Sequence, residues 1–232
     1  GWEDSAIKAR KRLDELARSG AVLSLVELIS LPGSEAILKS IALAQEYQRR
    51  GRTYAALEEL FHALSASPGY LPLHQLLGVL LKENNRVEEA IAKFSTVART
   101  YEIRGQVSQA LTTYQMILEI SPLDIPVHRR VVELLVQHGR IDDALTQYLQ
   151  TADVYYQLAQ PERAREIYSE ALKIAPRGSG DKAWAPRILH RMADLDVQRL
   201  DWHAAIKDYE AILRVAPDDE RAHLALYRLY PR

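Results

Sequence analysis

The strongest constraint in this sequence is a block of residues that recurs after 54 positions. Residues 71–122 are repeated as residues 125–176, and the two copies end in Pro122 and Pro176. Pro68 ends a third, more divergent copy. Self-similarity at a fixed period is typical of a repeat architecture, in which each unit buries its apolar face against its neighbours.

The apolar residues inside these units follow helical spacing, and turns are indicated at Gly and Pro positions. We therefore expect an all-α fold of about 13 helices with no strands. The expected helices that can be bounded from the sequence lie at residues 3–18, 21–31, 34–50, 53–66, 87–104, 141–158, 183–199, 202–215 and 219–230.

A tighter pattern lies within the units and is complete at Ala98, Tyr101, Gly105, Ala110, Tyr114, Leu118 and Pro122. It resembles the tetratricopeptide repeat, a helix-turn-helix unit of about 34 residues, in an array of bacterial type. Further matches lie at residues 37–70, 145–178 and 186–219. The resemblance implies an α-solenoid that forms a single domain and winds as a right-handed superhelix.

Small and aromatic residues of this pattern are expected in the core. Ala98 and Ala110 must be small where antiparallel helices cross at about 8 to 10 Å. His74 and His128, each two residues after a proline that opens a helix, are expected in a repeated first-turn or packing role, with proton sensing as the alternative. Eight tyrosines fall on core positions of the pattern: Tyr47, Tyr101, Tyr114, Tyr148, Tyr155, Tyr168, Tyr209 and Tyr230.

The 54-residue period departs from the family pattern by an extra helix. Residues 87–104 contain no Gly or Pro, so one helix should carry residues of two successive repeats. Because helices joined by short turns run antiparallel, a three-helix unit reverses the direction of equivalent helices from one copy to the next. We expect this reversal to interrupt the single concave groove of ordinary arrays.

These boundaries predict one solenoid domain with five segments. We expect a lead helix at 1–20, repeat units at 21–70, 71–124 and 125–178, and a tetratricopeptide repeat with a truncated helix at 179–232. Residues 177–181 form the one Gly/Ser-rich linker and are expected to be flexible. Since the chain starts at Gly1 and stops after an apolar segment, we expect it to be part of a longer protein.

Composition excludes several classes of function. Thirty basic and thirty-one acidic residues give a formal charge of -1, which disfavours a nucleic-acid partner. The chain has no cysteine, and its longest apolar run, residues 21–29, is too short to span a bilayer, so no membrane partner is expected. The sequence does not indicate the cellular compartment, although we favour the cytoplasm.

We expect neither catalysis nor a cofactor. No two of the seven histidines lie four residues apart on a helix, so no metal site is predicted. Residues 178–182 superficially suggest a phosphate loop, but they lack its spacing and a preceding strand. No serine has a marked base partner, which argues against an enzyme.

The remaining interpretation is a non-catalytic protein-interaction scaffold that binds a peptide or helix of a protein partner. The alternative is a sensing or oligomerising arm of a larger regulator. The resemblance places a possible partner-binding groove at Gln45, Arg49, Arg99, Glu102, Asp153, Tyr156, His190 and Asp194. These residues do not match the Lys, Asn and Arg carboxylate clamp of chaperone-binding relatives. Tyr156 and Arg99 are the expected hot spots.

Overall fold

The computed structural model describes residues 34–180 and 183–230, and these are all-helical, with no strand. The expected helices at 3–18 and 21–31 lie outside the described residues. The described part of the chain holds eleven α-helices, fewer than the thirteen expected for the whole chain, and one short 3-10 helix. It forms two compact units, one up to Ser121 and one from Pro122.

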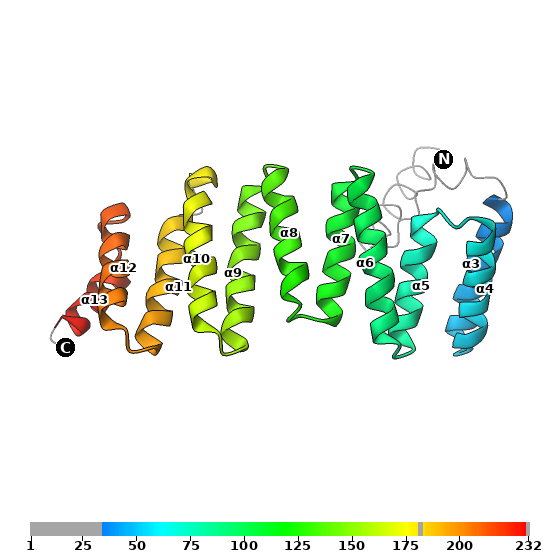
Figure 1. The fold of residues 1–232 in the computed structure, drawn as a ribbon, viewed down its shortest axis with the longest axis horizontal. Helices are drawn as coiled ribbons and strands as arrows, with labels where there is room; N and C mark the ends of the chain where they lie inside the picture. Colours follow the sequence, from blue (N-terminus) through cyan, green and yellow to red (C-terminus); the bar gives the residue numbers. More distant parts are fainter. Residues whose placement is uncertain (1–33, 181–182, 231–232) are drawn as a thin grey trace, which may run out of the picture. The chain divides into compact units, whose positions relative to one another are not determined.

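The first unit contains α3 (Ser34–Arg49), α4 (Thr53–Ala66), α5 (Leu71–Glu83), α6 (Val87–Ile103) and α7 (Val107–Ile120). Successive helices alternate in direction, as the turns at alternating ends show (Figure 1). Helix α6 packs against both α5 and α7, which confirms that one helix serves two successive helix pairs. Because α5 is inserted, the equivalent helices α3 and α6 run in opposite directions, as the 54-residue period predicts (Figure 1).

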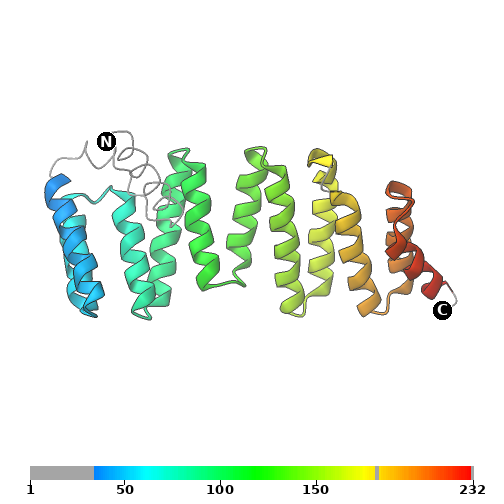
Figure 2. The same cartoon turned by 180° about the vertical axis from the view of Figure 1, so that it is seen from behind.

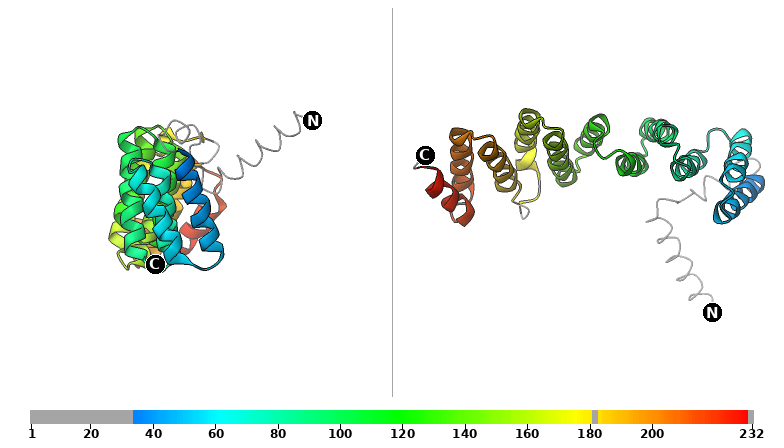
Figure 3. Two further views of the ribbon diagram at one scale, coloured as in Figure 1. Left: turned by 90° about the vertical axis from the view of Figure 1, so that its right-hand side faces the viewer. Right: turned by 90° about the horizontal axis from the view of Figure 1, so that it is seen from below.

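The second unit contains α8 (Ile125–Gln137), α9 (Ile141–Gln157), α10 (Pro161–Ile174), a 3-10 turn (Ala175–Arg177), α11 (Trp184–Gln198), α12 (Trp202–Val215) and α13 (Glu220–Leu229). From α9 onward the helices follow as ordinary antiparallel pairs, seen from behind in Figure 2 and nearly end-on in the right panel of Figure 3. Consequently α9 and α11 share one direction, and α10 and α12 share the other.

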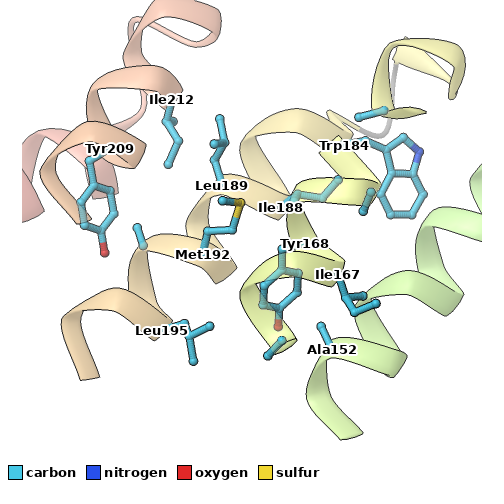
Figure 4. Packing of buried hydrophobic residues seen from close by; sticks show 14 of the residues in the cluster. Ala152, Ile167, Tyr168, Trp184, Ile188, Leu189, Met192, Leu195, Tyr209 and Ile212 are labelled. Carbon is cyan, nitrogen blue, oxygen red and sulfur yellow. The ribbon is translucent and has the colours of Figure 1, made fainter. Parts of the chain in front are cut away.

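One continuous apolar cluster joins helices α9 to α13 of the second unit (Figure 4). Ile188 and Met192 of α11 lie at its centre, between Tyr168 of α10 and Ile212 of α12 (Figure 4). The small residues of the repeat pattern lie where helices cross, and each has no exposed surface: Ala98, Ala110, Ala152, Ala164, Ala193 and Ala205. A larger side chain at such a crossing would clash, so these alanines set the close approach of the helices.

The turns inside the helix pairs share one geometry. At Gly51, Gly105 and Gly139 the backbone is left-handed, with φ between 69° and 71°. The following N–H donates to the carbonyl five residues back, as in the bond from Arg52 N–H to the carbonyl of Tyr47. The equivalent turns place Asn85, Ala159 and Leu200 in the same left-handed region, with φ between 55° and 62°. Ala159 and Leu200 therefore carry strain that glycine avoids.

Histidines fasten the ends of the helix pairs. His74, His128 and His223 each place Nε2 at 2.8 to 2.9 Å from the carbonyl oxygen of the proline six residues earlier. Gln147 Nε2 donates to Nδ1 of His128 at 2.6 Å, which leaves His128 Nε2–H as the donor to the proline carbonyl. The expected packing role of His74 and His128 is confirmed, and His223 repeats it.

The segment expected to be a flexible linker is partly fixed by Asp142 of α9. The carboxylate of Asp142 accepts hydrogen bonds from the backbone N–H and hydroxyl of Ser179, and from Nε1 of the buried Trp184 at 2.8 Å. Gly178 lies so close to Trp184 Cδ1 that an added Cβ would approach it to 2.7 Å. Residues 178–179 are thus held against the start of α9.

The core assignment of the tyrosines is correct for five of the eight: Tyr101, Tyr114, Tyr155, Tyr168 and Tyr209 are buried. Tyr47 and Tyr148 are only half-buried. The prediction that Tyr230 is a core residue is wrong, because Tyr230 follows the last turn of α13 and is 61% exposed. Its hydroxyl instead donates to Glu210 at 3.0 Å.

Candidate functional site

A small pocket in the second unit gathers several of the predicted groove residues. Its volume is about 130 Å³, and α9, α10 and α11 line it. Because α9 and α11 run in the same direction, equivalent residues of the two helices face the same side. The pocket is lined by Asp153, Tyr156, Tyr168, Arg191, Asp194, Leu195 and Gln198.

Asp153 occupies one side of this pocket. Its Oδ1 accepts a hydrogen bond from the hydroxyl of Tyr168 at 3.1 Å and lies 3.6 Å from Nη1 of Arg191. Burial and the nearby carboxylate of Asp153 raise the pKa of Tyr168 well above its ordinary value, so its hydroxyl remains a donor. No described residue bonds to Asp153 Oδ2, which leaves this oxygen as an acceptor at the pocket wall.

Asp194 repeats this arrangement on the next helix pair. Its Oδ1 accepts from the hydroxyl of Tyr209 at 3.2 Å, and Nη2 of Arg221 lies 2.6 Å from both carboxylate oxygens. Burial, reinforced by Asp194, raises the pKa of Tyr209 to about 12. Both carboxylate oxygens of Asp194 are therefore engaged by groups of this chain, whereas Oδ2 of Asp153 has no partner among the described residues.

The exposed surface of the site comes from Tyr156 and two neighbouring polar side chains. The Tyr156 side chain is 49% exposed, and Arg191 and Gln198 are also exposed. His190, although predicted for the groove, is not among the pocket residues. Its Nε2 lies 2.9 Å from Asp219, and its ring meets that of Tyr209 edge-on with centroids 6.1 Å apart.

The predicted groove residues of the first unit do not form a matching site. Gln45 and Arg49 are exposed on α3, where Arg49 pairs with Glu46 at 3.2 Å. Arg99 is exposed on α6 and bonds to no described residue, whereas Glu102 accepts from Tyr114 at 2.5 Å. No hydrogen bond or ion pair joins the α3 residues to those on α6. Helices α4 and α5 lie between α3 and α6 in the chain. Because α5 is the extra helix, α6 runs opposite to α3.

Sequence reasoning missed Arg191 and Arg221. Each extends from a following first helix to an aspartate on the preceding one, 38 residues back for Arg191 and 27 for Arg221. Because these separations differ, no fixed spacing could reveal the pairs. The tyrosine partners were detectable, since Tyr168 and Tyr209 each lie 15 residues after their aspartate.

A separate cluster of charges is enclosed by α10, α11 and α12. Arg165 Nε donates to both carboxylate oxygens of Asp196 at 2.9 and 3.0 Å, and its Nη2 lies 3.3 Å from Asp208. Asp196 is fully buried. Burial raises the pKa of Asp208 to about 6 against the opposing effect of Arg165, and Asp196 adds to the rise. This cluster faces the interior and serves packing between the helix pairs.

Other site types find little support in the described part of the chain. Residues 34–180 and 183–230 contain no group of three or more His, Asp or Glu side chains that could hold a metal ion. None of the described helices combines the length and apolar character needed to cross a membrane.

The fold and site define a class, an α-helical repeat protein with a polar, aromatic surface pocket on stacked helix pairs. Residues 148–177, which include all of α10, match the family model described as "Tetratricopeptide repeat". The chain therefore contains a stretch that matches a tetratricopeptide repeat, and proteins with such repeats generally mediate protein–protein interactions.

Two solved structures of this family are similar to the chain. A repeat protein from Bacteroides fragilis shares 12% identity over 83% of this chain and 97% of its own, with a TM-score of 0.49. TTC0263, a thermophilic repeat protein of Thermus thermophilus, shares 20% identity over 84% of this chain and 100% of its own, with a TM-score of 0.34. No curated protein matches the chain. The sequence match to this repeat family thus covers residues 148–177 alone among the residues of the chain.

Proposed function

We propose that the chain is a non-catalytic interaction scaffold that binds a peptide or helix of a partner protein on the α9–α11 face of the second unit. The observation that carries the proposal is the pocket in which Asp153, Tyr156 and Asp194 meet. Tyrosine and arginine are enriched among the residues that dominate binding energy, and this pocket presents one of each, Tyr156 and Arg191.

The chemistry of the pocket favours a partner segment with polar groups beside an apolar one. Asp153 Oδ2 offers an acceptor, and the exposed Arg191 offers a donor on the same rim. The ring of Tyr156 and the buried Leu195 supply the apolar surface. Truncating a central aromatic residue of an interface commonly costs about 2 kcal/mol or more, equivalent to about thirtyfold in affinity.

A capture experiment with matched variants tests this proposal. Wild type, Tyr156→Ala and Asp153→Lys would be immobilised, and the proteins they retain from a cell extract compared. Tyr54→Ala is the control, because Tyr54 is 84% exposed on α4 in the other unit. We expect a partner that both site variants lose and the control retains. An identical set of retained proteins for all four chains would remove the proposal.

Two finer expectations belong with this proposal. The first is that all segments form one right-handed solenoid domain. Its groove should be interrupted where the three-helix units meet, which the opposite directions of α3 and α6 support. The second is the alternative role as a sensing or oligomerising arm of a larger regulator. A second pocket, between α8, α9 and α10, favours sensing.

A further inference from the structure

The second pocket differs in position and chemistry from the one formed with α11. Its volume is about 160 Å³, and its floor consists of the buried residues Val132, Thr151 and Ile167. The rim carries two charges of opposite sign and a phenol, on Arg129 of α8, Glu170 of α10 and Tyr148 of α9. Glu133 also lines it but is engaged by Arg130 at 2.9 Å.

The equivalent place in the preceding 54-residue copy is filled. Phe94, which corresponds to Tyr148, has no exposed surface and packs directly on Gly78, where an added Cβ would lie 2.6 Å from Phe94 Cε1. The residue equivalent to Gly78 is Val132, whose side chain excludes a ring from that position. The half-buried Tyr148 accordingly lies at the rim, and the space remains open.

The rim residues also change character between the copies. In the preceding copy, Gln75 is equivalent to Arg129 and closes the contact by donating to Thr113 at 2.7 Å. Met116 of that copy is equivalent to Glu170. A neutral, closed contact in one copy is thus replaced by charged groups around an opening in the other. Packing alone does not require these charges, because the first copy is closed without them.

The charged groups of the rim are left unpaired within the described part of the chain. No hydrogen bond joins Arg129, Glu170 or Tyr148 to a described residue, and Arg129 lies within ion-pair distance of neither Glu133 nor Glu170. Burial, followed by the charge of Glu170, raises the pKa of Tyr148, so its hydroxyl stays protonated. The pocket therefore presents a cation, a carboxylate and a hydroxyl that this chain does not satisfy.

We propose that the pocket between α8, α9 and α10 binds a small zwitterion that carries one carboxylate and one ammonium group, such as a free α-amino acid. The ligand carboxylate accepts from the guanidinium of Arg129, and its ammonium group donates to Glu170. The ligand's apolar part lies on Val132 and Ile167. A volume of about 160 Å³ suits a ligand of this size and is below the range of roughly 300 Å³ and more for drug-sized ligands.

The test is a titration of the whole chain with the twenty L-amino acids and with γ-aminobutyrate, followed by calorimetry and by shifts of the amide NMR signals. The preceding copy supplies conservative variants, Arg129→Gln and Glu170→Met, whose side chains occupy the equivalent places there. Arg163→Gln is the control, because Arg163 is exposed on α10, pairs with Glu166, and neither of the two lines the pocket. γ-Aminobutyrate separates its charges more widely and so reports the spacing that the site prefers.

We expect at least one zwitterion to bind with a dissociation constant of about 1 mM or below. Each pocket variant should weaken that binding by about tenfold or more, since each removes a charge-assisted hydrogen bond, whereas Arg163→Gln should not. Absence of binding up to about 10 mM for every ligand, or equal binding by wild type and Arg129→Gln, would overturn the inference. The outcome is independent of the interaction scaffold, because Tyr156 and Asp153 lie outside this pocket.

Discussion

Replacing Asp208 with asparagine should change how the stability of the second unit depends on pH. The carboxyl group of Asp208 is nearly buried, with 9% of its side chain exposed, and faces Arg165, Asp196 and Lys207. Its pKa rises from 3.8 to about 6, so the folded chain binds the proton more tightly than the unfolded chain. This stabilisation is complete below about pH 4 and is lost as the pH rises through about 6.

The magnitude follows from the size of the shift. A shift of about two units at about 1.4 kcal/mol per unit predicts a change of about 3 kcal/mol in unfolding free energy. Wild type should therefore lose about that much stability relative to Asp208→Asn between pH 4 and pH 7. The asparagine keeps an oxygen that accepts from Arg165 Nη2, which lies 3.3 Å away in wild type, so the comparison isolates the ionisation.

Urea unfolding of both chains at pH 4, 5, 6 and 7 measures this difference. Trp184 and Trp202 open α11 and α12, the helices that carry Asp196 and Asp208, so their fluorescence reports on this part of the fold. Trp2→Phe in both chains removes the remaining tryptophan. A free-energy difference that stays constant over this range, or one that grows in favour of wild type as the pH rises, would refute the reasoning.

Three further substitutions test the packing, each by thermal or urea unfolding. Leu200→Gly should stabilise the fold by about 0.5 to 1 kcal/mol, because Leu200 has φ 62° and is 67% exposed; a loss of stability would contradict the strain argument. Gly78→Ala should destabilise it by about 1 to 3 kcal/mol through the clash with Phe94, whereas the same change at the open Gly69 should not. His128→Phe should cost about 1 to 3 kcal/mol by leaving its buried partners unpaired, and an unchanged midpoint would exclude this role.

The sequence was informative wherever the signal was local or periodic. Helices expected at 53–66, 202–215 and 87–104 are observed at Thr53–Ala66, Trp202–Val215 and Val87–Ile103. A Gly or Pro residue follows each of these segments and marks its end. The absence of both residues within 87–104 correctly predicted a single helix. Such breaks act on the backbone directly, so they can be interpreted without knowledge of the tertiary fold.

The candidate site was only partly predictable. Their positions in the repeat pattern predicted that Asp153, Tyr156 and Asp194 lie on the exposed face of their helices. The structure brings these three residues together in one pocket. The repeat pattern also placed groove residues on α3 and α6, but these do not meet in the structure. The inserted α5 changes which helices are neighbours. Contacts between distant residues, such as Arg191 with Asp153, leave no periodic trace in one sequence.

The shared helix α6 also restricts how such a chain can change in length. A duplicated unit with an odd number of helices inverts the polarity of everything that follows it, whereas a unit of two helices preserves it. Within the first unit, deleting α5 alone would therefore present α6 and α7 end for end, whereas deleting two helices would keep the direction of those that follow in that unit. An odd or even number of inserted helices, rather than the number of inserted residues, thus decides the direction of the helices that follow in this unit.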